Sequence, residues 1–344
     1  MKARAASTTV AVATTIAAAG RLALRRSVKS IKTRSKPLID PLYELPADVE
    51  HLEITSPDGA HIHVMARGQG RPILLIHGIT LRGEVWAPQM HLLADRYRMY
   101  AMDVRGHGRS TVGADGLGRA AAASDIVAVI ESLDLTGVVI VGHSMGGMIL
   151  MEFIGGHRDV VAERVSGLVF MDTAASGVIA APIAPLARAV GRVLTNRVQS
   201  GGTPLRGLSG DSDFAWLAAR LGFGAKPSGR AVEQMRRLQS QALPSTVIAS
   251  GVDLIDHDGR WALAGTTTPS LVLVGSRDLL TPVRQARKIA QFLPNARLEV
   301  IPLAGHQLMQ ERPREVSTLI DEFAAGLEPP GDPTLLPPVA YQGR

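Results

Sequence analysis

A serine lies between two glycines in the pattern Gly142-x-Ser144-x-Gly146, directly after the apolar run Val138–Val141. The helix-forming run Met148–Ile154 follows it. A strand, a tight turn and a helix in this order hold a serine in a strained conformation with its hydroxyl exposed. Glycine is needed on both sides because larger residues would collide where the strand and helix backbones approach each other. The pattern therefore predicts a nucleophilic serine at the end of a buried strand.

A serine hydroxyl becomes a useful nucleophile only beside a base, and the base needs an acid that fixes its tautomer. The candidate base is His306, in the loop that follows the last predicted strand. Two acids downstream of the serine also follow strands, Asp278 and Asp172. We favour Asp278, because the loop after its strand gives the carboxylate room to turn toward the base. Asp172 remains the alternative acid.

Attack of a serine on a carbonyl group creates an oxyanion, which needs two preorganised N–H donors. The residue after the serine, Met145, supplies one backbone amide in such a turn. We expect the second amide to come from Ile79, in the loop after the predicted strand that ends at His77. Both donors belong to the backbone, so their position in the chain identifies them and their residue type does not.

The remaining histidines near these elements are predicted to be structural. His143 is expected to pack against the turn or to orient it, and His77 to support its loop. His257, between two aspartates, is interpreted as a solvated turn residue. His61 and His63 have the spacing of metal ligands, but no third ligand is nearby, so we interpret them as solvent-facing strand residues. No metal site is predicted.

The elements that must position these residues alternate along the chain. Apolar or alternating runs predict eight strands, over His51–Ser56, His61–Ala66, Pro72–His77, Tyr97–Met102, Val138–Val141, Ser166–Met171, Ser270–Gly275 and Ala296–Ile301. Helical runs separate most of them, over Glu84–Asp95, Ala120–Leu133, Met148–Ile154, Pro282–Phe292 and Pro313–Ala325. This alternation predicts an α/β fold with a mostly parallel eight-stranded sheet flanked by helices. The turn Asp58-Gly59 predicts a hairpin at its antiparallel edge.

The alternation stops between residues 173 and 265, where helical runs are separated by Gly, Pro and Ser and no strand is evident. Because the α/β pattern resumes afterwards, we interpret 173–265 as a helical cap inserted into one catalytic domain, which comprises 42–172 and 266–326. A basic N-terminal extension, 1–41, precedes the catalytic domain. A flexible Pro-rich tail, 327–344, follows it.

The charge is unevenly distributed along the chain. The net charge is +6, but the first 39 residues hold nine Lys or Arg and no acid, which leaves 28 basic and 31 acidic residues elsewhere. The folded part is therefore slightly acidic, and no nucleic-acid partner is predicted. The sequence contains no cysteine, which excludes disulfides, thiolate metal sites and a cysteine nucleophile.

The N-terminal stretch Thr8–Gly20 resembles the apolar part of an export signal. Threonines interrupt it, however, it is shorter than the ~20 residues of a spanning helix, and seven Lys or Arg follow. Basic residues on that side favour retention in the cytoplasm, so we expect a cytoplasmic protein. A basic amphipathic helix over Arg21–Lys32 would allow peripheral contact with an anionic membrane. A disordered tail is the alternative.

Several of these motifs jointly resemble the α/β-hydrolase superfamily, over about Leu42 to Gly326. They are His77-Gly78, the loop Asp103-x-Arg105-Gly-His107-Gly-x-Ser110, Gly-His-Ser144-Met-Gly-Gly, Gly-Ser-Arg-Asp278 and Gly-His306. The resemblance implies a catalytic triad of Ser144, Asp278 and His306 beneath a helical cap. The charged loop that begins at Asp103 is expected to brace the site rather than to take part in the chemistry.

Within that superfamily, a serine nucleophile disfavours epoxide hydrolases and haloalkane dehalogenases, which use an aspartate at this position. The resemblance favours a serine esterase or lipase that cleaves small acyl or lipid esters through an acyl-enzyme, with no cofactor. A C–C bond hydrolase and a cofactor-free haloperoxidase or perhydrolase would use the same triad and stay open as alternatives. A non-catalytic relative is disfavoured, because every triad position is filled.

Overall fold

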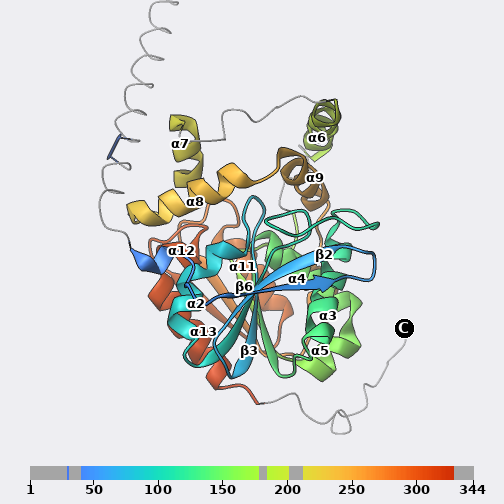
Figure 1. Cartoon of the computed structure of the whole chain (residues 1–344), viewed down its shortest axis with the longest axis vertical. Coiled ribbons are helices and arrows are strands. Elements are labelled where there is room, and N and C mark those ends of the chain that lie inside the picture. The colour runs from blue at the N-terminus through green and yellow to red at the C-terminus, as the bar shows by residue number, and fades with distance from the viewer. Residues whose placement is uncertain (1–28, 31–39, 178–183, 201–211, 329–344) are drawn as a thin grey trace, which may run out of the picture.

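The computed structural model describes residues 29–30, 40–177, 184–200 and 212–328. The C-terminal tail from residue 329 and almost all of the N-terminal extension, including the predicted amphipathic helix apart from two residues, lie outside this part of the chain. Figure 1 shows a central twisted sheet with helices on both faces and a further group of helices above one end of the strands.

Eight strands form a single sheet in the order β1-β2-β4-β3-β5-β6-β7-β8. Their bounds are Glu50–Thr55 (β1), His61–Arg67 (β2), Arg71–Ile76 (β3), Tyr97–Met102 (β4), Val138–His143 (β5), Val165–Met171 (β6), Ser270–Gly275 (β7) and Ala296–Ile301 (β8). Strand β2 is antiparallel to β1 and β4, and the other neighbouring pairs are parallel. The predicted α/β fold, a mostly parallel eight-stranded sheet with an antiparallel hairpin at its edge, is confirmed.

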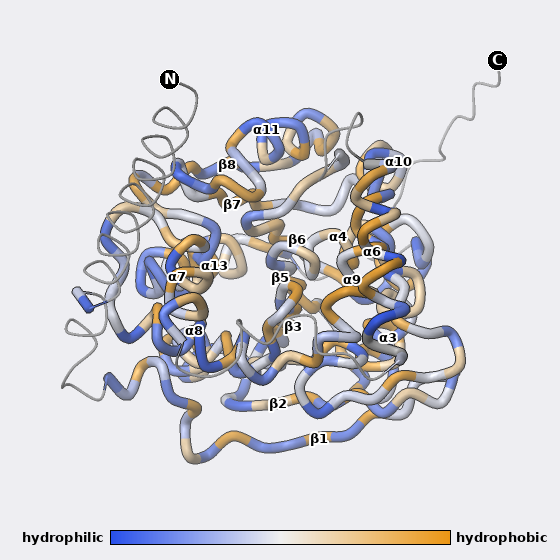
Figure 2. Tube along the Cα trace, turned by 90° about the horizontal axis from the view of Figure 1, so that it is seen from above, coloured by the Kyte–Doolittle hydropathy of each residue, from blue (hydrophilic) through white to orange (hydrophobic). Residues whose placement is uncertain are grey.

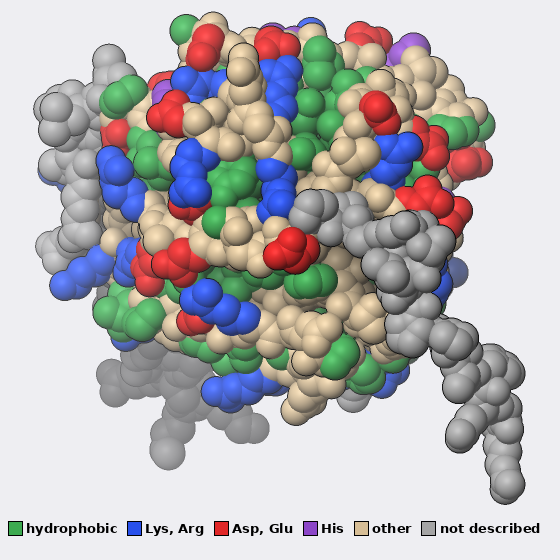
Figure 3. Space-filling model, turned by 90° about the horizontal axis from the view of Figure 1, so that it is seen from below, with side chains coloured by type: hydrophobic (Ala, Val, Ile, Leu, Met, Phe, Trp, Pro, Cys, Tyr) green, Lys and Arg blue, Asp and Glu red, His purple; other side chains and the backbone are tan. Residues whose placement is uncertain are grey.

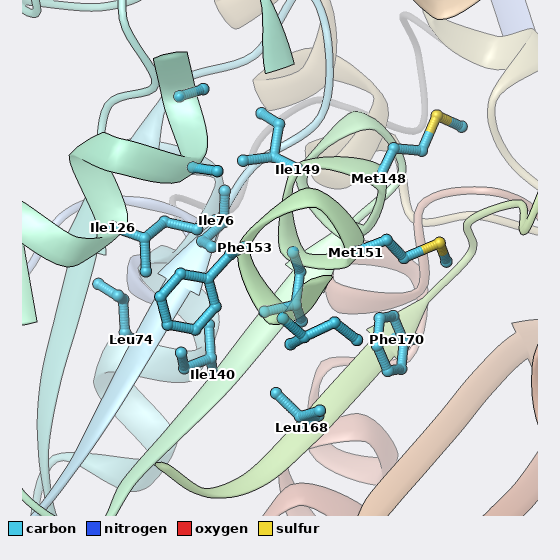
Figure 4. Close-up of a cluster of buried hydrophobic side chains, with 14 of the residues drawn as sticks. Leu74, Ile76, Ile126, Ile140, Met148, Ile149, Met151, Phe153, Leu168 and Phe170 are labelled. Carbon is cyan, nitrogen blue, oxygen red and sulfur yellow. The ribbon is translucent and has the colours of Figure 1, made fainter. Parts of the chain in front are cut away.

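Alternate residues of the central strands enter two hydrophobic layers, one on each face of the sheet. In β3, Leu74 and Ile76 belong to one layer, whereas Ile73 and Leu75 belong to the other. Figure 4 shows the first layer, where Phe153 of the helix after β5 packs over the strands. Because both faces are covered, the strands show continuous apolar runs instead of an alternation of apolar and polar residues.

The helices divide between these two layers. Those that cover the first are α3 (Arg119–Ser132), α4 (Met145–Gly156), α5 (Arg158–Arg164) and α11 (Val283–Phe292). Those that cover the second are α2 (Ala87–Leu93), α12 (Leu308–Glu311) and α13 (Pro313–Ala325), with the 3-10 turns η1 (Pro41–Tyr43) and η2 (Gly83–Trp86). The single helix predicted over Glu84–Asp95 is divided into η2 and α2. Pro88, which has no N–H to donate, lies in the first turn of α2.

Between β6 and β7 the described residues form helices α6 (Ala184–Gln199), α7 (Asp213–Leu221), α8 (Gly229–Gln241), α9 (Pro244–Ile255) and α10 (Arg260–Leu263). Figures 1 and 2 show α6 beside α9 and α7 beside α8, both pairs above the carboxyl ends of the parallel strands. Helix α10 instead packs against α4 and α11 below. We call helices α6 to α9 the cap.

The face opposite the cap is seen in Figure 3, where acidic and basic side chains are interspersed and are not separated by sign. This face lies at the amino ends of the parallel strands, far from the residues that follow the strands. Among the residues that the structure describes, no helix is long and apolar enough to cross a bilayer.

Candidate active site

The turn between β5 and α4 holds Ser144 in a strained backbone conformation, with φ 53° and ψ −117°. A Cβ on Gly142 would lie 2.7 Å from the carbonyl oxygen of Gly146, and one on Gly146 would lie 2.4 Å from that of Ile76. No real Cβ tolerates such contacts with backbone, so the two glycines are required where strand, helix and the neighbouring β3 converge. The predicted turn is therefore present, with the serine at its apex.

The structure brings Ser144, His306 and Asp278 into one chain of hydrogen bonds. Ser144 Oγ lies 3.0 Å from Nε2 of His306, and Nδ1 of His306 lies 2.8 Å from Oδ2 of Asp278. The three residues are 8%, 5% and 3% exposed, respectively. An ionised carboxylate at Nδ1 favours the tautomer with its proton there, so Nε2 is left to accept the serine hydroxyl proton.

The carboxylate of Asp278 is surrounded by donors. Oδ1 accepts the amides of Leu280 and Thr281 at 2.8 and 2.9 Å, and Oδ2 also accepts the Thr281 hydroxyl at 2.6 Å. Burial raises the pKa of Asp278, but the charge of His306 and the hydrogen bonds from His306 and Thr281 outweigh burial and bring it to about 2. The acid is thus ionised at neutral pH. Sequence reasoning missed Thr281, although the Asp-x-x-Thr spacing is typical of a turn in which an aspartate caps following amides.

The alternative acid, Asp172, points elsewhere. Its two oxygens accept the backbone amides of Gly275, at 2.9 Å, and Leu308, at 3.3 Å. Burial and the nearby charge of Asp278 raise the pKa of Asp172 well above its ordinary value. With φ 44°, it is also one of the few residues other than glycine in the left-handed region. Asp172 therefore ties the end of β7 to the segment that follows His306, and Asp278 is the acid that contacts the histidine.

The two expected oxyanion donors flank the serine. Met145 is the first residue of α4, so its amide has no acceptor inside the helix. The loop that carries Ile79 lies against the turn, since a Cβ on Gly78 would lie 3.0 Å from Cβ of Ser144. The next residue, Thr80, has φ 66°, which reverses the chain beside the site. Both amides thus belong to backbone segments adjacent to the serine.

His143 reaches from the turn to the loop of His306. Its Nε2 lies 2.8 Å from the carbonyl oxygen of His306, and the two ring centroids are 5.0 Å apart. Burial and the neighbouring His306 lower the pKa of His143 to about 3, so the ring is neutral and Nε2–H is the donor. The sequence predicted that His143 packs against the turn or orients it, but did not predict this hydrogen bond to the loop of His306.

The loop after β4 supports the site from the side. His77 accepts the amide of Val104 at Nε2, at 2.9 Å, which joins the ends of β3 and β4. Arg105 is 1% exposed and binds the carboxylates of Asp125 and Asp58 at 2.6 and 2.8 Å. Asp103 accepts the amide of Gly83 at 2.7 Å. These contacts are within the scaffold, and none of them reaches the serine.

Two of the predicted exposures are wrong. His63 is 6% exposed and donates from Nδ1 to Asp103 at 2.8 Å, while only His61 of this pair faces solvent. The loop after β4 folds over one end of β2 and covers His63. His257 is 2% exposed and its Nε2 donates to the carbonyl oxygen of Ala174 at 2.9 Å. Its neighbouring aspartates are solvated, but the ring turns inward.

The fold and the site define a class of protein. The profile of a family described as "alpha/beta hydrolase fold" matches residues 71–313 of this chain. A non-heme chloroperoxidase of Kitasatospora aureofaciens is 32% identical over 262 residues, which cover 73% of this chain and 90% of that protein. The chain belongs to the α/β-hydrolase family.

Other relatives are similar over the same region. The pimeloyl-[acyl-carrier protein] methyl ester esterase of Stenotrophomonas maltophilia is 27% identical, over 78% of this chain and 98% of that protein. Among solved structures, an esterase of Thermogutta terrifontis matches with a TM-score of 0.68 at 27% identity, covering 80% of this chain and 98% of that one. The similarity therefore spans nearly the whole length of each relative.

Proposed function

We propose that the protein is a serine hydrolase that cleaves carboxylic esters through an acyl-enzyme. The observation that carries this proposal is the continuous hydrogen-bonded chain from Ser144 through His306 to Asp278, with the serine at the apex of a strained turn. A base within 3.0 Å of the hydroxyl has the geometry required for proton abstraction. The esterases among its relatives support the same chemistry.

In the first half of the reaction, Nε2 of His306 takes the hydroxyl proton as Ser144 Oγ bonds to the ester carbonyl carbon. Asp278, ionised and bonded to Nδ1, stabilises the imidazolium that forms. The amides of Met145 and Ile79 donate to the oxyanion of the tetrahedral intermediate. When the intermediate collapses, the C–O bond to the alcohol breaks and the proton on Nε2 leaves with the alcohol.

In the second half, a water molecule gives a proton to Nε2 of His306 and its oxygen attacks the acyl carbon. The bond to Ser144 then breaks, and the proton returns from His306 to the serine oxygen. The acid product is released, and the three residues regain their starting protonation states. Each half therefore uses the same base and the same oxyanion donors.

The surroundings favour an apolar acyl group. Helix α9 of the cap, which Figure 2 colours as largely hydrophobic, lies close to the side chain of Ile79. The nearest atom to a Cβ placed on Gly251 of α9 would be Cδ1 of Ile79, at 3.8 Å. The apolar segment Ala180–Leu186 is also part of the predicted cap, but most of it lies outside the described residues. We propose acyl or lipid esters as substrates.

The second candidate activity is perhydrolysis, with peroxide in place of water in the second half of the reaction. Several relatives, between 28% and 32% identical, are named as non-heme chloroperoxidases or haloperoxidases. The peracid that forms would oxidise halide in acid, and the protein would need only the same three residues. Peracid formation in peroxide buffer distinguishes this activity from plain ester hydrolysis.

The proposal is tested by labelling the full chain with a fluorophosphonate, which reacts with activated serines. We expect the wild type to be labelled at Ser144 and the variant Ser144→Ala to remain unlabelled. A series of p-nitrophenyl esters of increasing acyl length then defines the substrate class. Equal labelling of the two proteins would refute the assignment of the nucleophile.

A further inference from the structure

A buried carboxylate connects the cap to the loop of His306. Glu311 ends the short helix α12, five residues beyond the histidine, and is 7% exposed. Its Oε2 accepts two backbone amides, that of Gly305 at 2.9 Å and that of Gly224 at 2.8 Å. Gly305 precedes the histidine, whereas Gly224 belongs to the connection between α7 and α8. One oxygen thus binds both segments.

The same two segments also bind each other directly. The amide of His306 donates to the carbonyl oxygen of Gly222 at 2.8 Å, and the amide of Ala225 donates to that of Leu303 at 3.0 Å. The partners run in opposite directions, so residues 222–225 and 303–306 pair in the antiparallel sense. The backbone of His306 is therefore held by the cap through its N–H and by His143 through its carbonyl.

The pairing depends on very close contact between backbones. A Cβ on Gly224 would lie 2.1 Å from the carbonyl oxygen of Leu303, and one on Gly305 would lie 2.4 Å from the amide nitrogen of Gly224. Leu303 itself has φ 62°, in the left-handed region. No flexible side chain separates the two segments, so a movement of the 222–225 connection is transmitted to the backbone of His306.

We infer that Glu311 is a positioning residue, which aligns the imidazole of His306 by fixing its loop to the α7–α8 connection of the cap. This inference rests on the proposed role of His306. Hydrogen bonds from amides to a carboxylate are among the stronger ones in proteins. Breaking these two bonds would leave the N–H groups of Gly305, next to the base, and of Gly224, in the cap connection, without their acceptor. The loop of His306 would then gain freedom where the reaction needs fixed geometry.

Two variants distinguish the loss of the negative charge of Glu311 from the loss of its hydrogen-bond acceptor. Glu311→Gln keeps an oxygen that can accept both amides. Oε1 has no hydrogen-bond partner in the described part of the chain, so an NH2 group in its place breaks no hydrogen bond there. Glu311→Ala removes the acceptor. The matched control is Glu315→Ala, on α13. Its side chain is 47% exposed, and its carboxylate lies no closer than 4.0 Å to the guanidinium of Arg312.

Four measurements are made on each full-length protein. They are kcat and KM for p-nitrophenyl butyrate, the rate of fluorophosphonate labelling, the downfield proton resonance of the His306 Nδ1–H bond, and hydrogen exchange of the amides of Gly224 and Gly305. Stability in urea is recorded in parallel. A purely structural role would lower stability in proportion to the lost contacts without changing kcat or the downfield resonance of the protein that stays folded.

We expect Glu311→Ala to lower kcat and the labelling rate about tenfold or more, which corresponds to about 1.4 kcal/mol in the activation barrier. KM should change by less than about threefold, because the loss affects alignment rather than substrate binding. The downfield resonance should shift or broaden, and both amides should exchange faster. Glu311→Gln should retain most of the activity, and Glu315→Ala should match the wild type.

The inference is overturned if Glu311→Ala is labelled at the wild-type rate, or if its amides stay protected. It is also overturned if Glu311→Gln and Glu311→Ala lose activity only in proportion to their unfolded fractions. A wild type that is not labelled at Ser144 would instead refute the proposed function. In that case amide exchange still decides whether Glu311 joins the two segments.

Discussion

His143 donates a hydrogen bond from Nε2 to the carbonyl oxygen of His306, over 2.8 Å. The residue that precedes the serine therefore holds the backbone of the residue whose ring lies 3.0 Å from the serine hydroxyl. The two partners are 163 positions apart in the chain. The distance between Ser144 and His306 is thus set by a direct hydrogen bond between their own segments as well as by the sheet.

Replacing His143 should affect alignment. His143→Leu removes the donor and leaves a buried carbonyl oxygen unsatisfied, which typically costs about 1–3 kcal/mol. We expect kcat to fall about tenfold. His143→Gln should retain most activity, because its amide nitrogen can occupy the place of Nε2. The pKa of His143 is about 3, so the pH–rate profile of the Gln variant should follow that of the wild type above pH 5. A shifted profile would show that His143 titrates during the reaction.

The two acids should differ sharply when each becomes an amide. Asp278→Asn loses the carboxylate that fixes the tautomer of His306, so kcat/KM should fall on the order of a thousandfold. Asp172→Asn can still accept the amide of Gly275, and we expect a loss of less than about tenfold. Initial rates with one p-nitrophenyl ester decide the matter. The opposite order of the two effects would assign the acid to Asp172.

Asp172 should also make stability depend on pH. Its pKa is raised in the folded state, so the folded protein binds a proton more tightly than the unfolded chain does. This contribution is complete below the unfolded pKa of about 3.8 and is lost as the pH rises through the folded pKa. Within that window the wild type should lose up to about 1.4 kcal/mol per pH unit relative to Asp172→Asn. Urea unfolding of both proteins from pH 4.5 to 8 measures this difference, and parallel stability curves would contradict it.

The glycine after Met145 should tolerate no side chain. In Gly146→Ala the new Cβ would lie 2.4 Å from the carbonyl oxygen of Ile76, which belongs to the central strand β3 and cannot move away cheaply. We expect a loss of about 1–3 kcal/mol in unfolding free energy, together with loss of fluorophosphonate labelling. Gly156→Ala, at the other end of α4, is the control. It meets nothing within 4 Å and should be neutral or slightly stabilising. Equal stability of the two variants would argue against the close approach.

Much of the fold was predictable because its signals are local. Apolar runs, Gly-rich turns and helical periodicity each depend on residues within one element, and they located the strands of the sheet and its long helices. The helices α5 and α12 were missed, since seven and four residues are too few to show a period of 3.6. Their formation depends on the strands and helices against which they pack.

The sequence predicted which residues form the candidate site better than it predicted the contacts that they make. Parallel strands bring their carboxyl ends to one edge of the sheet, so the residues that follow β5, β7 and β8 lie close together regardless of how much sequence separates them. Exposure was harder, because His63 of β2 and His257 of the α9–α10 connection are covered by segments from elsewhere in the chain. The aspartates on either side of His257 are solvated, but this does not indicate whether another segment covers the imidazole ring.

The sequence by itself determined the fold class and the order of serine, acid and histidine, because short-range patterns encode strands, turns and helices. Only the tertiary structure decided that Asp278 and not Asp172 contacts His306, and that Glu311 binds the cap. Those partners depend on the paths of loops that meet across long separations, 87 residues for Glu311 and Gly224. Which donors a carboxylate contacts depends on the folded backbone around it, and the sequence alone does not specify this.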